Sequence, residues 1–127
     1  MRLALDTNRY VDFARNVPEA VEKVREAERI YMALVVLAEL RAGFVCGSKT
    51  VENERTLARF FDSPRVVVLH PDEDTTHHYA RLFRQLRIQG TPIPTNDIWL
   101  AALVVQHNLR LYARDMHFDA LPQLSRV

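Results

Sequence analysis

The sequence predicts a three-layer α/β domain with a central parallel sheet of four or five strands flanked by helices. Its apolar runs are short, and they lack the alternation of polar and apolar residues that marks a strand with one side in water. Longer segments with helical periodicity lie between most of these runs. The 127 residues suffice for one continuous core, so we expect a single domain, residues 1–127.

Strands are predicted where an apolar run is short and uninterrupted. Such runs are rich in valine, isoleucine and leucine, and polar or turn-forming residues bound them. In chain order they are residues 3–5, 30–35, 66–69, 109–113 and, as a short edge strand, 124–127.

Helices are predicted where apolar residues recur every three or four positions after a start signal. Pro18 begins the first, either Ser48 or Thr50 caps the third, and either Thr95 or Asn96 caps the last. In chain order the helices are residues 19–28, 36–45, 51–61, 71–89 and 97–107. The boundary between the strand 30–35 and the helix after it is left open.

Composition narrows the class of protein. The net charge of +1 argues against a strongly basic nucleic-acid-binding surface, although lysine occurs only at Lys23 and Lys49 and arginine supplies the other positive charges. Cys46 is the only cysteine, so neither an internal disulfide nor a cysteine-rich zinc site is expected. No apolar run is long enough for a secretion signal or a membrane span. The sequence therefore predicts a cytoplasmic protein without a membrane partner.

Four carboxylates stand beside or within apolar segments, at Asp6, Glu39, Asp97 and Asp115. An ionised carboxylate in such surroundings is costly unless it is paired or binds a cation. In a parallel α/β sheet the carboxyl ends of the strands share one edge, where the acids after the first and fourth predicted strands would meet. We therefore expect a shared metal site at that edge.

Each acid taken alone also has an ordinary interpretation. Asp6 could be a turn residue, Asp97 a charge at a helix start, and Asp115 the cap of a turn over 116–120. Glu39 could be solvated, although its neighbours are apolar. The metal site is favoured because the ordinary interpretations require four separate coincidences.

The acids also lie in segments that resemble the motifs of a known family. Residues 5–8, 37–41 with Gly43, 96–102 and 112–118 resemble the motifs of PIN-domain ribonucleases, and most of all those of VapC toxins from prokaryotic toxin-antitoxin systems. The likeness spans nearly the whole chain, and the motifs come in the family's order.

This resemblance implies an endoribonuclease that depends on Mg²⁺ or Mn²⁺. The four acids would be its catalytic residues and metal ligands, and Thr7 and Asn8 would orient Asp6 or a water on the metal. The cation would activate water for attack on an RNA phosphodiester. The resemblance also implies a homodimer and inhibition by a small VapB-like antitoxin.

Other charged and aromatic residues have predicted roles around this site. Arg9, Arg41 and Arg114 flank three of the acids, and we expect them to position phosphate or to balance the acidic charge. Where the family often has a hydroxyl residue and a further acid, this chain has Ala113 and His117. We predict that His117 packs against its surroundings, although its place near the site leaves open a contact with substrate.

Two alternatives are kept open. The first is a PIN-like module that binds RNA or a protein without cutting. The second is a receiver domain, which is of similar length and fold class. A receiver domain would need a lysine after its last strand, whereas Lys49 is the last lysine of this chain.

Overall fold

The computed structural model describes all 127 residues and confirms the predicted three-layer architecture. The five strands form one sheet in the order β3-β2-β1-β4-β5, and every neighbouring pair is parallel. The strands are β1 (Arg2–Leu5), β2 (Arg29–Ala33), β3 (Val66–Leu69), β4 (Arg110–Tyr112) and β5 (Ser125–Arg126). The helices are α1 (Thr7–Ala14), α2 (Pro18–Glu26), α3 (Leu34–Cys46), α4 (Thr50–Phe61), α5 (Glu73–Gln89), α6 (Thr95–Gln106) and the short 3₁₀ helix η1 (Met116–Ala120).

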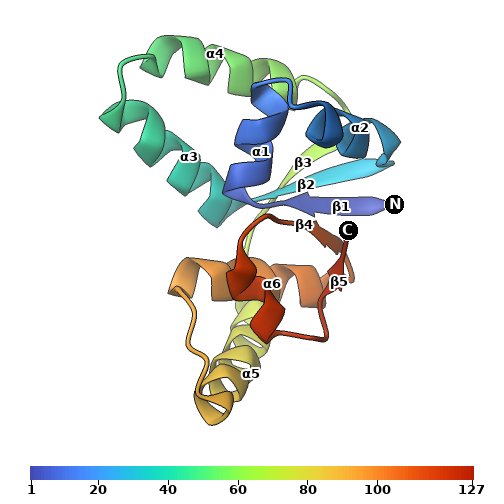
Figure 1. Cartoon of the computed structure of the whole chain (residues 1–127), viewed down its shortest axis with the longest axis vertical. Coiled ribbons are helices and arrows are strands. Elements are labelled where there is room, and N and C mark those ends of the chain that lie inside the picture. The colour runs from blue at the N-terminus through green and yellow to red at the C-terminus, as the bar shows by residue number, and fades with distance from the viewer.

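Helices cover both faces of the sheet. Figure 1 shows α1 to α4 on the upper side of the sheet and α5 with α6 on the lower side. From β1 the chain continues to β2 and β3 on one side, and it returns to β4 and β5 on the other. The order of strands therefore reverses beside β1, and in open α/β sheets the crevice at this point, outside the carboxyl ends of the strands, is where ligands bind.

The core is almost entirely apolar, and the central strand β1 contributes fully buried residues to it. Leu3 and Leu5 are fully buried, as are Ile30 on β2 and Leu111 on β4. Complete burial of each such side chain stabilises the fold by about 1.5–3 kcal/mol relative to exposure. A strand buried on both faces needs apolar residues at consecutive positions, which is why the first strand shows no alternation in the sequence.

One helix was not predicted, and two predictions of helix caps were wrong. The helix that was not predicted, α1, begins directly after Asp6. Lys49, rather than Ser48 or Thr50, stands at the cap of α4, and the Thr50 hydroxyl donates to a carbonyl at the end of α3. The last α-helix begins after Pro94, so neither of its predicted capping residues has that role. No helix of the chain is long and apolar enough to cross a membrane.

Candidate functional site

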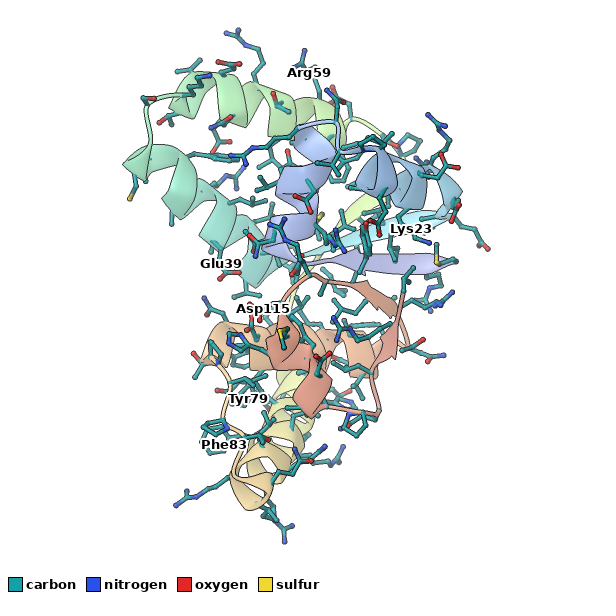
Figure 2. The ribbon with its side chains drawn as sticks, in the orientation of Figure 1. Lys23, Glu39, Arg59, Tyr79, Phe83 and Asp115 are labelled. Carbon is teal, nitrogen blue, oxygen red and sulfur yellow. The ribbon has the colours of Figure 1, made fainter.

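The four predicted acids come from four separate elements. Asp6 follows β1, Glu39 lies on α3, Asp97 is in the first turn of α6, and Asp115 follows β4. In Figure 2, Glu39 and Asp115 lie on the same side of the molecule, where the upper and lower helical layers meet at the end of the sheet. The fold therefore brings these residues to the edge that the sequence predicted.

Asp6 is buried, and both of its carboxylate oxygens accept backbone hydrogen bonds. Oδ1 accepts from the N–H of Arg9 at 2.7 Å, and Oδ2 accepts from the N–H of Arg114 at 3.3 Å. Burial raises the pKa of Asp6, while these hydrogen bonds and the Arg9 charge oppose the rise. Asp6 thus caps α1 and also fixes the backbone directly before Asp115.

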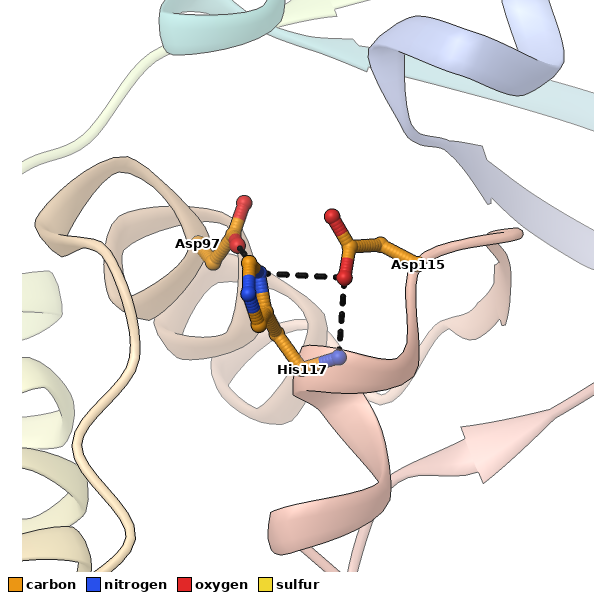
Figure 3. Close-up of side chains that lie close together, drawn as sticks. All are labelled: Asp97, Asp115 and His117. Carbon is orange, nitrogen blue, oxygen red and sulfur yellow. Dashed lines mark hydrogen bonds and ion pairs between the residues drawn. The ribbon is translucent and has the colours of Figure 1, made fainter.

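Asp97, Asp115 and His117 form the tightest group of titratable side chains in the site (Figure 3). The Nδ1 atom of His117 lies 2.8 Å from Oδ2 of Asp97 and 3.0 Å from Oδ1 of Asp115. Burial raises the pKa of Asp97, and the charges of Asp115 and Glu39 add to the rise, while the contact with His117 opposes it. Repulsion between carboxylates is thus partly relieved by the imidazole.

His117 departs from its sequence prediction. It was expected to pack against its neighbours, yet 45% of its side chain is exposed and its ring nitrogen bridges two carboxylates. Its backbone N–H donates to Oδ1 of Asp115 at 2.9 Å, so Asp115 caps η1 as well as contributing to the cluster. The sequence places His117 near Asp115, two positions earlier, but gives no sign of its contact with Asp97, which is 20 positions away.

Glu39 joins the elements that carry the other acids. Its Oε1 accepts from the Thr7 hydroxyl at 2.7 Å, and its Oε2 accepts from the Asn96 amide at 3.5 Å. Thr7 is next to Asp6 and Asn96 is next to Asp97 in the chain, so the Glu39 side chain links the start of α1 to the start of α6. Thr7 therefore orients Glu39, whereas the sequence assigned it to Asp6 or a bound water.

The apolar surroundings predicted for Glu39 are not present. Glu39 is exposed, and so are Ala38 and Leu34 on the same helix. The sequence could not show this because nearly every residue of α3 is apolar, which leaves no polar stripe to mark the exposed face. Asn8, also predicted to orient the site, is exposed and makes no side-chain hydrogen bond.

The predicted phosphate-positioning arginines are engaged with acids outside the quartet. Arg9 and Arg114 both donate from Nη1 to Asp12, at 3.3 and 3.2 Å, and the Arg9 guanidinium lies 4.4 Å from the centre of the Tyr112 ring. Arg41 donates to Glu54 at 3.1 Å and so ties α3 to α4. In the protein without RNA these arginines thus brace the elements around the site, and their contact with phosphate stays a prediction.

Asp12 is the residue that the sequence analysis missed. It is buried on α1, and the two arginines that it binds through their side chains are the same two that bind Asp6 through their backbone. The four residues form a closed link between α1 and the segment after β4. A predicted α1 would have revealed part of it, because Arg9 and Asp12 are three positions apart on one helical face.

The atoms of the site that could bind a metal suit a divalent cation. One oxygen each from Asp97 and Asp115 and one nitrogen of His117 lie within 4.8 Å of one another. Carboxylate oxygens are the ligands that Mg²⁺ and Mn²⁺ favour. Burial is the main cause of the raised pKa of Asp97, and a cation would offset the repulsion from Asp115 and Glu39 that adds to it.

A groove opens beside these acids between α1, α3 and α4. It has a volume of about 520 Å³, and Thr7 and Glu39 form part of its wall. Tyr10 and Phe44 supply apolar surface, while Arg15 and Lys49 supply positive charge. The groove thus leads from a mixed apolar and charged surface to the acidic edge.

The family model for the PIN domain matches residues 3–124. This chain belongs to the PIN-domain family. Ribonuclease VapC1 of Haemophilus influenzae (strain R2866) is 31% identical to this PIN domain, over 87% of this chain and 89% of that protein.

Solved structures show the same fold. The structure of VapBC-1 from nontypeable Haemophilus influenzae aligns with a TM-score of 0.87 at 28% identity, over 100% of this PIN domain and 97% of that chain. VapBC2 from Rickettsia felis, bound to a DNA fragment from its promoter, aligns with a TM-score of 0.88 at 24% identity. The alignment covers 100% of this chain and 98% of that chain. The PIN fold of this chain therefore extends over its whole length.

Proposed function

We propose that this chain is a metal-dependent endoribonuclease that acts as the toxin of a toxin-antitoxin pair, with residues 1–127 as one nuclease domain. The observation that carries the proposal is the convergence of Asp6, Glu39, Asp97 and Asp115 at one edge of a PIN fold. The relative named Ribonuclease VapC1, at 31% identity, supports the reaction class and the toxin role.

The chain's own residues prepare this edge for RNA. Asp97 and Asp115 would hold the cation, Asp6 is fixed beside them by two backbone N–H groups, and Glu39 is oriented by Thr7. A bound Mg²⁺ or Mn²⁺ supplies the positive charge that phosphodiester hydrolysis requires. The Arg114 side chain is 54% exposed next to Asp115, so it is available to the phosphate backbone when RNA arrives.

The proposed inhibitor is a small VapB-like antitoxin. Structures of VapBC complexes are among the relatives of this fold. An antitoxin segment in the groove between α1, α3 and α4 would reach Glu39, which lies in the groove wall. An arginine from that segment could pair with the acids bidentately and exclude the cation. Co-purification with the antitoxin, followed by a structure of the complex, tests this contact, and light scattering tests the proposed homodimer.

Cleavage of RNA tests the nuclease proposal directly. Purified protein and a total RNA pool are incubated with Mg²⁺ or Mn²⁺, with and without a chelator. We expect cleavage that the chelator stops and that Asp6→Asn and Asp115→Asn abolish. Glu22→Gln is the matched control, because Glu22 is an exposed acid of α2 paired only with Arg25. Cleavage by both aspartate variants, or in excess chelator, would refute a metal nuclease. RNA binding without cleavage by the wild type would favour the silent module.

A further inference from the structure

His117 occupies a position that a passive surface residue would not need. Its Nδ1 atom is within 3.0 Å of one oxygen from each of Asp97 and Asp115, although almost half of its side chain is exposed. An exposed imidazole has many rotamers open to it, and holding one of them costs conformational entropy. The ring is therefore held over the two carboxylates by specific contacts.

The segment that carries His117 is anchored on both sides of it. Its own backbone N–H is bonded to Asp115, and the next residue, Phe118, is 1% exposed in the core. These contacts fix the start of η1, and with it the direction in which the His117 side chain leaves the backbone. The imidazole is thus preorganised toward the carboxylates, as a ligand would be.

The distances within this group match those between neighbouring ligands of a small cation. In an octahedron with bonds of 2.0–2.1 Å, adjacent donor atoms lie about 2.8–3.0 Å apart. The separations from Nδ1 to the two carboxylate oxygens are 2.8 and 3.0 Å. The His117 nitrogen is consequently spaced from each of the two carboxylate oxygens as one ligand of an ion is from its neighbours.

We propose that His117 is a nitrogen ligand of the cation and that it makes this site prefer Mn²⁺ over Mg²⁺. The inference rests on the proposed function, whose metal site it makes more specific. Mg²⁺ favours oxygen ligands almost exclusively, whereas divalent transition metals bind imidazole well. A site of carboxylates alone would discriminate less between the two ions than one that includes His117.

Spectroscopy of bound Mn²⁺ tests the ligand without using activity. We expect the electron spin echo of Mn²⁺ bound to the wild type to show modulation by a directly coupled ¹⁴N nucleus. His117→Asn, which places an amide in a similar position, should remove that modulation. His77→Asn is the matched control, because His77 is exposed on α5 and should leave the signal unchanged. Bound Mn²⁺ without nitrogen coupling in the wild type would overturn the inference.

Titration calorimetry with each ion tests the preference. Since loss of even an outer partner of a metal ligand costs about 10- to 100-fold in affinity, loss of the imidazole should weaken Mn²⁺ binding by at least about tenfold. Mg²⁺ binding should change much less in His117→Asn. Equal losses for both ions would overturn the preference alone. Failure of the folded wild type to bind either ion would overturn the metal site of the proposed function as well.

Discussion

Replacement of Asp97 by asparagine should abolish cleavage and yet stabilise the metal-free protein. The closest oxygens of Asp97 and Asp115 in the cluster lie within 4.8 Å, and two full charges at that separation repel by about 3.5 kcal/mol at an effective dielectric constant of 20. The bridging imidazole of His117 and the water around Asp115 reduce this energy. Loss of a negative charge in the first turn of α6 costs about 0.3–1 kcal/mol in the opposite direction.

We expect a net stabilisation of about 1 kcal/mol, which for a domain of this size raises the melting temperature by about 4 °C. Calorimetry in the presence of a chelator measures it. A cation at 100 times its dissociation constant adds about 2.7 kcal/mol to a protein that binds it, so saturating Mn²⁺ should make the wild type the more stable form. If metal-free Asp97→Asn melts well below the wild type, Asp97 is chiefly a structural residue and the reasoning about the acidic cluster fails.

Three further predictions concern the residues around the cluster. Asp12→Asn and Arg114→Gln should each lower the free energy of unfolding, and the double variant should lose less than the sum of the two single losses. A double-mutant cycle measured by urea unfolding should give a coupling energy of about 1 kcal/mol. Strict additivity would show that the Asp12–Arg114 pair contributes nothing to stability. Thr7→Val should reduce the cleavage rate by about 10-fold or more, because Glu39 loses the hydroxyl that orients it, while the melting temperature changes little; an unchanged rate would remove Thr7 from the site. Burial raises the pKa of Asp6 above its unfolded value, so the folded state holds the proton more tightly and the ionisation of Asp6 costs stability as pH rises from about 4 through the raised pKa. The stability of Asp6→Asn relative to the metal-free wild type should therefore increase over that pH range and level off above it, and calorimetry between pH 3 and 7 that shows no such trend would contradict the raised pKa.

The architecture could be predicted because its signals are local. The central strand is apolar at consecutive positions from Leu3 to Leu5, which only a strand covered on both faces requires. The long helix α5 has its own start and stop signals, since Asp72 and Thr75 form a reciprocal cap and Gly90 ends it with φ of 70°. Each of these features depends on neighbouring residues alone.

What the sequence did not reveal depends on contacts between distant segments. The helix α1 was missed because its eight residues mix charged and apolar types, and it is held in place by Asp6 and by packing against α2 and α3. The position of His117 depends on α6, whose Asp97 is 20 residues away in the chain. The four acids were found because they stand beside or within apolar segments, whereas Asp12 lies in a segment that mixes charged, polar and apolar residues and carries no such mark.

The pairing of β1 with β4 also determines at what stage of folding the site can form. Asp6 and Arg114 are 108 positions apart and meet only after β4 has inserted beside β1. A chain emerging from the ribosome can pair β1 with β2 early, but it lacks Asp115 and His117 until almost all of it has been synthesised. Such a chain lacks Asp115 and His117, so its metal-binding cluster is incomplete. If the proposed function holds, the nascent chain should not cut the messenger that encodes it until its last strands have closed the sheet.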